Sequence, residues 1–465
     1  MTTPGRDINT ITSAASPDQE IVELDVEVGP VAHGGHCVAR TDGRVIFVRH
    51  GIPGERVRVR LTEAGPDARF WRGDVVQVLE ASPDRVEHFW HAADSGRAWS
   101  NGHPPVGGAE FGHIAPARQR ALKSAVLAEQ LERLAGLGSG AGSAVEVEEV
   151  LPGGDDPQAA AGLGWRTRAS FSVTKGGRLG MHAHRSDQVY AVREMPLAVD
   201  AINALRLWDV DLQGIDRVEV AAPANGSRPL ILLAPAAGTK AKRLAAILAQ
   251  LPEDVSVASF DPETTETLQL RGRTWVQESA VGHEYRVTGA GFWQIHRRAP
   301  ETLVGAVTDF LGDGGFLQPG ATVADLYAGA GLFTARLADL VGETGSVLSV
   351  EGSPGTSRDA RKNLHGAPQV SIVQGRVEKV LRQKPHNFDA LVLDPPRAGA
   401  GKAVVKQLMA SGPRAIAYVS CDPASFARDL GYFRQGGWQL AGLRGFDLYP
   451  NTHHLETVAL LTPRA

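Results

Sequence analysis

Short apolar runs alternate with helical stretches over the last third of this 465-residue chain, and this alternation limits the possible folds more than any other feature. Strand-length runs that are apolar on both faces, separated by helical crossovers, are typical of a parallel sheet with helices packed on each side. We therefore expect an α/β domain over residues 290–465. Its parallel strands are expected at residues 322–327, 346–351, 370–374, 390–394 and 415–421.

The alternation of strands and helices stops at the end of the chain. Two further strand-like runs, 439–447 and 456–461, are separated by the short connection Tyr449-Pro450-Asn451-Thr452. No helix fits in that connection, so the two runs are predicted to pair antiparallel. Which edge of the sheet Glu456 reaches depends on the direction of its partner strand, and the sequence leaves this open. A parallel sheet that ends in an antiparallel hairpin is, by analogy of fold, the plan of class I S-adenosylmethionine methyltransferases with a Rossmann-like sheet.

Ligands of open α/β sheets bind beyond the carboxyl ends of the strands, so the residues at these ends are candidates for function. The first strand is followed by a loop that contains Gly329 and Gly331, where a ligand can approach the backbone. Glu351, at the end of the second strand, can accept both ribose hydroxyls of an adenosine. The phosphate-binding pattern Gly-x-Gly-x-x-Gly is incomplete, because Thr334 occupies the third position. S-adenosylmethionine, which has no pyrophosphate, therefore fits better than NAD.

The fourth strand leads into Asp394-Pro395-Pro396-Arg397. Two prolines cannot continue a strand ladder, so this segment is either a rigid loop over the cleft or a purely structural turn. Methyltransferases that act on amino groups place an aromatic residue at the last position. Arg397 stands there instead, which argues against chemistry on adenine N6 and favours a substrate with oxygen acceptors.

The fifth strand ends in Ser420-Cys421-Asp422-Pro423, and Cys421 is one of two cysteines in the chain. A free cysteine is commonly buried and inert, but its position at a strand end favours a role in the site. If Cys421 and Glu456 converge there, a thiol and a base lie beside a methyl donor. A thiolate that adds to carbon 6 of uracil makes carbon 5 nucleophilic, and a base must later remove the carbon-5 proton. Such a uracil would have to be unstacked from its RNA.

The N-terminal part predicts a second, smaller domain. Residues 1–20 are polar and lack the apolar core of a signal peptide, which indicates a flexible tail. Five short strands over residues 21–82 predict a small barrel of the OB type. Alternation places Arg56, Arg58 and Arg60 on one strand face, which is either solvated or tracks phosphates. A stripe of leucines predicts a helix over 114–135 that packs on the catalytic domain, followed by a flexible break at 136–143.

Residues 83–289 are predicted to form a central α+β domain. Residues 166–193 carry six basic residues against one acid, a net charge of +5, with aromatic residues interleaved. This mixture suits either RNA binding or an ordinary solvated hairpin. The spacing of the histidines in the preceding stretch matches no standard zinc pattern, so no metal site is expected there. These histidines are His88, His91, His103 and His113.

Several motifs together resemble the RNA uracil-C5 methyltransferases, which act on tRNA or ribosomal RNA, and residues 21–82 resemble their TRAM domain. The resemblance implies that Cys421 is the nucleophile, that Glu456 accepts the proton and that Arg397 orients the uracil. It also implies a set of S-adenosylmethionine-binding residues: Gln294, Tyr327, Gly329, Gly331, Glu351 and Asp394. The motifs are Phe292-Trp293-Gln294, residues 325–331, Asp394-Pro395-Pro396-Arg397, Ser420-Cys421-Asp422-Pro423 with Arg428-Asp429-Leu430, and residues 450–456.

The chain departs from this family in three places. Ala109 stands where some members have a cysteine of a four-cysteine iron–sulfur cluster, and with only Cys37 outside the catalytic part no such cluster is expected. Ala328 replaces a frequent cysteine in the glycine loop without expected consequence. His296 follows the glutamine motif where asparagine is usual, which affects how the substrate is positioned.

Two other functions are compatible with parts of the sequence. A non-catalytic RNA-binding or assembly factor would need only the barrel and the basic segment. A cytosine-C5 methyltransferase would carry its cysteine on the fourth strand's loop, where this chain has Arg397. The net charge of −4 excludes a histone-like protein, and no apolar run is long enough to span a membrane. We expect a cytoplasmic, monomeric enzyme whose partner is RNA, with ribosomal RNA slightly favoured over tRNA.

Overall fold

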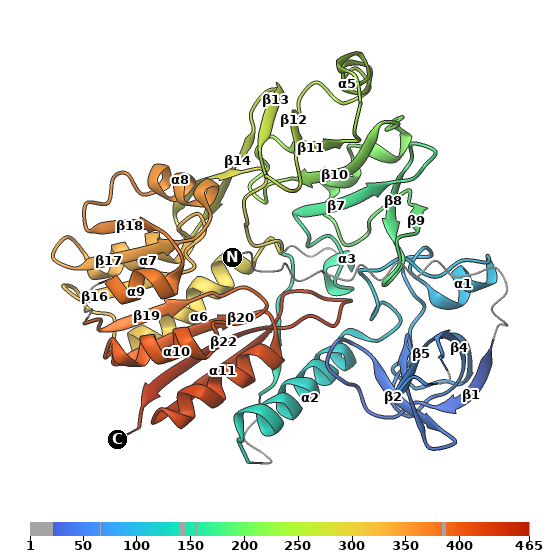
Figure 1. Cartoon of the computed structure of the whole chain (residues 1–465), viewed down its shortest axis with the longest axis horizontal. Coiled ribbons are helices and arrows are strands. Elements are labelled where there is room, and N and C mark those ends of the chain that lie inside the picture. The colour runs from blue at the N-terminus through green and yellow to red at the C-terminus, as the bar shows by residue number, and fades with distance from the viewer. Residues whose placement is uncertain (1–21, 66, 139–144, 154–156, 384–386, 465) are drawn as a thin grey trace, which may run out of the picture.

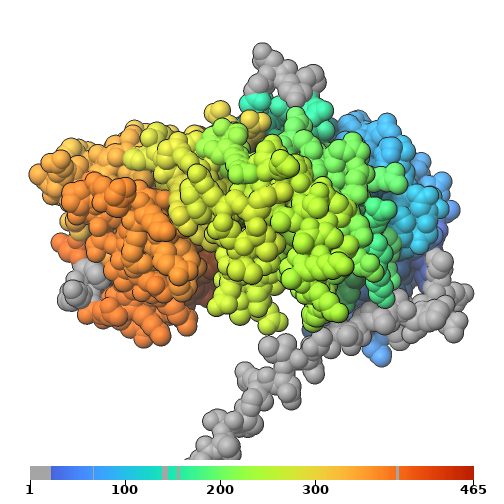
Figure 2. Space-filling view, turned by 90° about the horizontal axis from the view of Figure 1, so that it is seen from above, coloured from blue at the N-terminus to red at the C-terminus, as the bar shows by residue number. Residues whose placement is uncertain are grey.

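The computed structural model describes residues 22–464 apart from residues 66, 139–144, 154–156 and 384–386. The predicted tail and most of the predicted break after the helix at 114–135 therefore lie outside the described residues. Within the described part, the chain forms a small N-terminal sheet, a central sheet, a two-stranded hairpin and a large C-terminal sheet. Seen from above, the C-terminal part, the central part and the N-terminal part follow one another along the molecule (Figure 2).

The N-terminal sheet has five strands in the order β1-β4-β5-β3-β2 and curls around an apolar core. Two backbone hydrogen bonds of Val38, to Gly29 and to Pro30, join β2 to the chain that follows β1. This pairing of short strands around one core agrees with the predicted OB-type barrel. The strands are β1 (Glu23–Glu27), β2 (Cys37–Thr41), β3 (Arg44–Arg49), β4 (Arg56–Glu63) and β5 (Phe70–Glu80).

Helix α2 (Pro116–Ala135) follows the barrel and a short helix α1 (Ser95–Ser100), and it confirms the helix predicted from the leucine stripe. The helix ends at Gly136, whose φ of 63° is left-handed. It lies against α11 (Pro423–Gln435) of the C-terminal part (Figure 1). The two helices approach closely at Gly431, where a Cβ would lie 2.8 Å from the carbonyl oxygen of Leu134.

The central sheet has seven strands in the order β13-β12-β11-β10-β7-β8-β9, and all neighbours except β11 and β12 pair antiparallel. The hairpin β14–β15 connects it to the C-terminal part. The strands are β7 (Arg168–Val173), β8 (Leu179–His182), β9 (Val189–Ala191), β10 (Ile215–Ala221), β11 (Leu230–Pro235), β12 (Ser256–Phe260), β13 (Thr267–Arg271), β14 (Trp275–Ala280) and β15 (His283–Thr288). The helices are α3 (Pro157–Ala160), α4 (Asp200–Asn203), the 3₁₀ helix η1 (Leu207–Asp209) and α5 (Ala241–Leu248).

The C-terminal sheet has the order β18-β17-β16-β19-β20-β22-β21-β6 and confirms the predicted parallel sheet with its antiparallel ending. Strands β16 to β20 pair in parallel, whereas β22 is antiparallel to both β20 and β21. The edge strand β6 (Val147–Glu149) was not predicted, because three residues give too short a pattern. The other strands are β16 (Thr322–Leu326), β17 (Ser346–Glu351), β18 (Val370–Gln374), β19 (Ala390–Leu393), β20 (Ala415–Ser420), β21 (Trp438–Asp447) and β22 (Glu456–Pro463).

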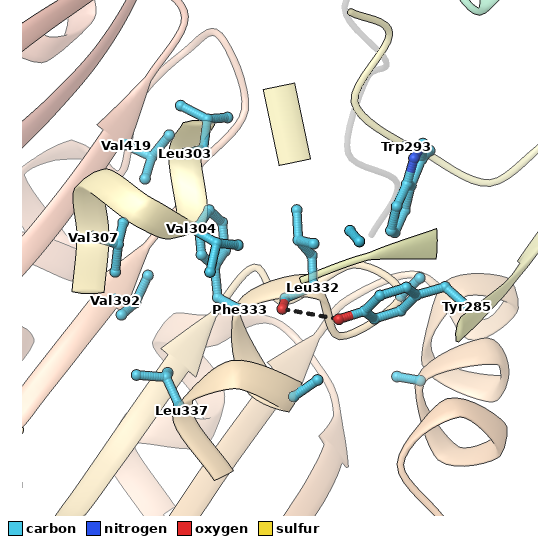
Figure 3. Close-up of a cluster of buried hydrophobic side chains, with 14 of the residues drawn as sticks. Tyr285, Trp293, Leu303, Val304, Val307, Leu332, Phe333, Leu337, Val392 and Val419 are labelled. Atoms are coloured by element: carbon cyan, nitrogen blue, oxygen red, sulfur yellow. Dashed lines mark hydrogen bonds between the residues drawn. The ribbon is translucent and has the colours of Figure 1, made fainter. Parts of the chain in front are cut away.

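Apolar side chains cover both faces of this sheet. Val323 belongs to the core on one face and its neighbour Ala324 to the core on the other, as alternation along a strand requires. On the first face, Tyr285 of the hairpin packs beside Leu332, and its hydroxyl donates to the Leu332 carbonyl at 3.4 Å (Figure 3). The helices are α6 (Ala299–Asp313), α7 (Leu332–Val341), α8 (Pro354–Asn363), α9 (Val377–Gln383), α10 (Gly401–Ala410) and α11.

Strand directions answer the question that the sequence left open for Glu456. Because β22 runs antiparallel to the parallel strands, its first residue lies at the edge where those strands end. Ser420, the last residue of β20, pairs with Thr457, the second residue of β22. Continuing this register by one residue brings Cys421 opposite Glu456.

Candidate active site

The carboxyl edge of the C-terminal sheet gathers the predicted catalytic residues. Cys421 follows β20, Glu456 begins β22, and Asp394 and Arg397 follow β19. Since β19, β20 and β22 are neighbours in the sheet, their ends meet at one edge. Residues that face each other across an antiparallel pair have Cα atoms about 4.5–5.5 Å apart. The thiol and the carboxyl group are therefore placed side by side.

The Glu456 carboxyl group is buried, with 2% of the residue exposed. Burial raises the pKa of Glu456 well above its ordinary value, and the nearby Asp394 raises it further. Two groups oppose this rise: Arg397, and the Tyr449 hydroxyl, which donates to Glu456 Oε2 at 3.1 Å. A raised pKa makes the ionised carboxylate a stronger base, which suits this group to proton transfer.

The Cys421 thiol is partly buried and unbonded to another cysteine. Burial raises the pKa of Cys421 to about 12, the Glu456 carboxyl adds to the rise, and Arg397 lowers it. In the free protein the thiol is therefore neutral at pH 7. A thiol of this kind becomes reactive once a substrate brings positive partners closer or a base takes its proton.

Arg397 is exposed, and its guanidinium contacts the ring of His454. Burial lowers the pKa of His454 to about 3, with the neighbouring His453 contributing, so the ring is neutral. The Arg397 Nη2 donates to His454 Nε2 at 3.4 Å. The guanidinium makes no other hydrogen bond within the part of the chain that the structure describes, so most of its donors are available to a carbonyl or phosphate oxygen.

Gln294 is buried and joins the segment that follows the β14–β15 hairpin to the end of β19. Its Nε2 lies 3.4 Å from Asp394 Oδ2. Burial raises the pKa of Asp394 to about 7, and the Asp325 carboxyl group contributes. The predicted pair of cofactor contacts, Gln294 and Asp394, is thus held together on one side of the cysteine.

The loop after β16 carries the other predicted cofactor contacts. Tyr327 has a left-handed φ of 68°, and Gly329 and Gly331 have φ values of 56° and 94°. The backbone N–H of Gly329 donates to Glu351 Oε2 at 2.8 Å, and that of Ser353 donates to Oε1 at 2.5 Å. The Glu351 carboxylate is therefore fixed at the end of β17, with a further lone pair on each oxygen.

The residues of this loop fit an adenosine-type cofactor. A Cβ added to Gly329 would meet nothing within 4 Å, so the backbone faces open space there. Asp325 is fully buried beneath the loop, where Thr334 donates to its Oδ2 at 2.5 Å. Its Oδ1 has no partner among the described residues. An open backbone edge, a fixed carboxylate and a buried acceptor are what a ligand with hydroxyl and amino groups requires.

A cavity of about 160 Å³ opens beside the cysteine. Arg397, Cys421 and His454 form one side of it, and the barrel loop with His33 and Gly35 forms another. His33 Nε2 lies 3.0 Å from Asp422 Oδ2, next to the cysteine. The barrel therefore contributes to the wall of the site, which the sequence did not predict.

Two basic surfaces predicted from the sequence are altered by the structure. On β4, Arg56, Arg58 and Arg60 each pair with an acid, namely Glu80, Asp25 and Glu23. This strand face is consequently not a bare row of positive charges.

In the segment 166–193 and at Trp165 just before it, part of the basic and aromatic set lies inside the protein. Trp165 and Phe171 are buried, and the guanidinium of Arg168 donates to the carbonyl of Gly291 at 2.7 Å. Burial lowers the pKa of both Arg166 and Arg168. Only the remaining basic residues are exposed to a ligand: Lys175, Arg178, Arg185 and Arg193.

Two of the four histidines in residues 83–113 lie in the interior of the protein. His88 and His113 are buried, and His88 Nε2 lies 3.0 Å from the carbonyl oxygen of Ala109. Over the residues that the structure describes, no group of three or more His, Cys, Asp or Glu side chains could hold a metal ion.

Several residues at the site were not singled out from the sequence. They are His33, Lys123, Tyr449 and His454. Tyr449 and His454 lie within or next to the motif that ends at Glu456, but the sequence pattern does not show where their side chains point. His33 and Lys123 lie more than 290 residues before the cysteine, and only the folded chain brings them to it.

Comparisons with known proteins agree with this fold and site. A family model of the TRAM domain matches residues 19–76, and a model described as tRNA (Uracil-5-)-methyltransferase matches residues 374–464. An "Uncharacterized RNA methyltransferase" of Streptomyces avermitilis is 43% identical over 95% of this chain and 99% of its own length. The 23S rRNA (uracil(1939)-C(5))-methyltransferase RlmD of Enterobacter sp. is 28% identical over 94% of this chain and 96% of its own.

A solved structure shares the fold over most of the molecule. The tRNA (uracil-54, C5)-methyltransferase of Pyrococcus abyssi, in complex with S-adenosyl-L-homocysteine, superposes with a TM-score of 0.65 and 19% identity. The match covers 94% of this chain and 99% of the other. No helix among the described residues is long and apolar enough to cross a membrane.

Sheet and site together define a methyltransferase of class I architecture. More closely, the chain belongs to the family of RNA uracil-C5 methyltransferases with an N-terminal TRAM domain.

Proposed function

We propose that this protein methylates carbon 5 of a uridine in RNA through a covalent bond between Cys421 and carbon 6 of the base. The observation that carries the proposal is the register of β20 and β22, which puts Cys421 opposite Glu456 at the carboxyl edge of the sheet. A thiol and a buried carboxyl group beside a cofactor loop are the groups that this reaction needs.

Arg397 and Cys421 act first. In the proposed reaction Arg397 donates a hydrogen bond to a carbonyl oxygen of the uracil. Its positive charge also stabilises the negative charge of the Cys421 thiolate. The Cys421 thiol gives up its proton to water, and the Sγ of the resulting thiolate forms a bond to carbon 6. The electron pair of the carbon 5–carbon 6 double bond moves toward carbon 5 and the carbonyl at carbon 4, which makes carbon 5 nucleophilic.

Glu456 acts last. S-adenosylmethionine, when bound near Gln294, Tyr327, Glu351 and Asp394, supplies the electrophilic methyl group that carbon 5 takes up. The carboxylate of Glu456 then removes the proton from carbon 5. The electron pair of that C–H bond restores the double bond, the bond between carbon 6 and Sγ breaks, and the thiolate leaves.

The rest of the molecule is proposed to bind the RNA. Residues 21–82 would form the TRAM-type barrel, residues 83–289 the central RNA-binding domain and residues 290–465 the methyltransferase domain. The exposed basic residues of 166–193 suit phosphate contacts. Ribosomal RNA is the proposed substrate, because RlmD of Enterobacter, a 23S rRNA enzyme, is 28% identical to this chain, whereas the tRNA enzyme of Pyrococcus abyssi is 19% identical, each over 94% of the chain.

The two cysteines provide a matched test. Cys37 lies in the core of the barrel, is 3% exposed and does not line the cavity beside Cys421. We expect Cys421→Ala to abolish methyl transfer to RNA while Cys37→Ala retains it. Glu456→Gln should accumulate an RNA adduct that survives a denaturing gel. Full methyl transfer by Cys421→Ala would contradict the proposal.

Two further measurements address the substrate and the alternative function. Mass spectrometry of 5-methyluridine in separated rRNA and tRNA, with and without the gene, should show a loss confined to rRNA. Titration calorimetry should detect S-adenosylmethionine binding. Absence of binding, together with retained RNA binding, would favour a non-catalytic RNA-binding factor.

A further inference from the structure

The Tyr449 hydroxyl lies in the candidate active site, and the proposed reaction gives it no role. Tyr449 belongs to the connection between β21 and β22, and its hydroxyl donates to Glu456 Oε2 at 3.1 Å. The ring packs against both neighbouring apolar cores and meets Trp165 edge-on, with ring centroids 6.0 Å apart. A buried tyrosine normally needs a partner for its hydroxyl, and here that partner is the proposed base.

The backbone of Tyr449 is fixed as firmly as its ring. Lys123 of α2 is 2% exposed, and its Nζ donates to the Tyr449 carbonyl at 3.0 Å and to Asp447 Oδ1 at 2.6 Å. Two residues further on, Gln119 and Asn451 exchange hydrogen bonds of 2.7 and 2.9 Å. Helix α2 thus holds the connection on both sides of the tyrosine, and the hydroxyl has little freedom to point elsewhere.

The charged and titratable groups around Glu456 explain what this hydrogen bond does. Asp394, from the end of β19, disfavours the charged carboxylate, and the thiol of Cys421 supplies no positive charge. Arg397 and Tyr449 are the groups that favour the carboxylate form. Arg397 is exposed and is engaged by the substrate in the proposed reaction. Tyr449 therefore remains the permanent donor to the base.

We propose that Tyr449 is a positioning residue for the base: its hydroxyl favours the charged carboxylate of Glu456 and aims the free oxygen, Oε1, at the proton on carbon 5. This inference rests on the proposed function and concerns only the elimination step. In that step the tyrosine hydroxyl keeps its own proton, and Glu456 alone accepts the proton from carbon 5.

Tyr449→Phe removes one oxygen atom and keeps the ring that packs in the two cores. We expect release of tritium from carbon 5 of labelled uridine in RNA to slow by about tenfold to a hundredfold, since a hydrogen bond to a charged group is lost. Formation of the Cys421 adduct should be spared, so the methylated adduct should accumulate on denaturing gels. The rising limb of the pH–rate profile should move to higher pH.

The matched control is Tyr432→Phe, which removes a hydroxyl from a partly buried tyrosine on α11 that does not line the cavity beside Cys421. It should leave tritium release and its pH profile unchanged. An unshifted pH profile for Tyr449→Phe, or a loss of rate explained by a lower unfolding temperature alone, would overturn this inference and leave the proposed function standing. Tritium release by Cys421→Ala in the same assay would instead overturn the proposed function.

Discussion

At the scale of single residues, the site shows how burial sets the chemistry of two acidic groups. Cys421 and Glu456 both have raised pKa values because both lose contact with water. The sequence identified these residues through their position after predicted strands. It could not show that Glu456 is buried beside Asp394, because that depends on β19 and β22, which lie more than 60 residues apart in the chain and both pair with β20.

The raised pKa of Glu456 predicts a stability effect. The folded chain binds this proton more tightly than the unfolded chain, so stability falls as pH rises above the ordinary glutamate range. Glu456→Gln keeps an acceptor for Tyr449 and removes the titration. We expect it to be more stable than the parent protein at pH 8, each unit of the pKa rise being worth about 1.4 kcal/mol.

Thermal unfolding of both proteins between pH 4 and pH 9 measures this effect. The difference should shrink as pH falls to 4, below the ordinary glutamate pKa of 4.5, because the glutamate then becomes protonated in the unfolded state as well as in the folded state. Equal stability at every pH would show that the carboxyl group is not destabilised by its surroundings.

At the scale of elements, the two glycines of the loop after β16 have different surroundings. Gly329 faces open space, whereas a Cβ on Gly331 would lie 2.8 Å from Leu364 Cδ1, at a φ of 94°. The sequence showed both glycines but not this difference, because Leu364 follows a helix that packs on the loop only in the folded chain.

We therefore expect the two glycines to respond differently to substitution by alanine. Gly331→Ala should destabilise the fold by about 1–3 kcal/mol, from backbone strain and the contact with Leu364. Gly329→Ala should cost less stability but weaken S-adenosylmethionine binding. Denaturant unfolding and calorimetry distinguish the two results, and equal loss of stability in both variants would contradict the assignment of Gly329 to the cofactor side.

Helix α2 packs most of its leucines into the core and also holds the connection between β21 and β22 in place. The leucine stripe predicted the helix, but its polar residues Lys123 and Gln119 fix the connection before β22. Lys123→Met leaves Asp447 as an unpaired buried carboxylate, which we expect to cost about 3–5 kcal/mol.

The companion double variant provides the control for this effect. Lys123→Met combined with Asp447→Leu removes both charges and should recover most of the stability. A double variant as unstable as Lys123→Met would show that the ion pair is not the cause. Urea unfolding of the parent, both single variants and the double variant gives the coupling energy.

At the scale of the whole molecule, the barrel reaches the catalytic cysteine. His33 pairs with Asp422, and Gly35 packs against His453 so closely that a Cβ would lie 2.6 Å from that ring. The sequence predicted the barrel, the α/β sheet and its antiparallel end, since each has a local pattern. It could not predict their docking, because contacts between distant segments leave no periodic signal.

The His33–Asp422 pair predicts a pH-dependent docking of the barrel. The hydrogen bond to Asp422 raises the pKa of His33. Burial alone would raise the pKa of Asp422, but His33 and the Ser425 N–H lower it to about 2. The pair therefore stabilises docking fully below pH 6.5 and loses its effect as pH rises through the pKa of the folded state.

Hydrogen exchange of the barrel loop 30–36 measures this docking. The imidazole is 41% exposed, so the contribution is expected to stay under about 1 kcal/mol, roughly a fivefold change in protection. His33→Ala should lower protection at pH 6 and change it little at pH 8.5. Equal effects at both pH values would contradict the role of the charged pair.

The covalent step is the central claim, and RNA that carries 5-fluorouridine tests it most directly. Fluorine at carbon 5 cannot be removed as a proton, so Glu456 cannot complete the elimination and the methylated adduct persists. We predict that mass spectrometry of the digested complex finds the RNA fragment, one methyl group heavier, on the peptide that contains Cys421. An adduct on Cys37, or methylated RNA released without any protein adduct, would contradict the account.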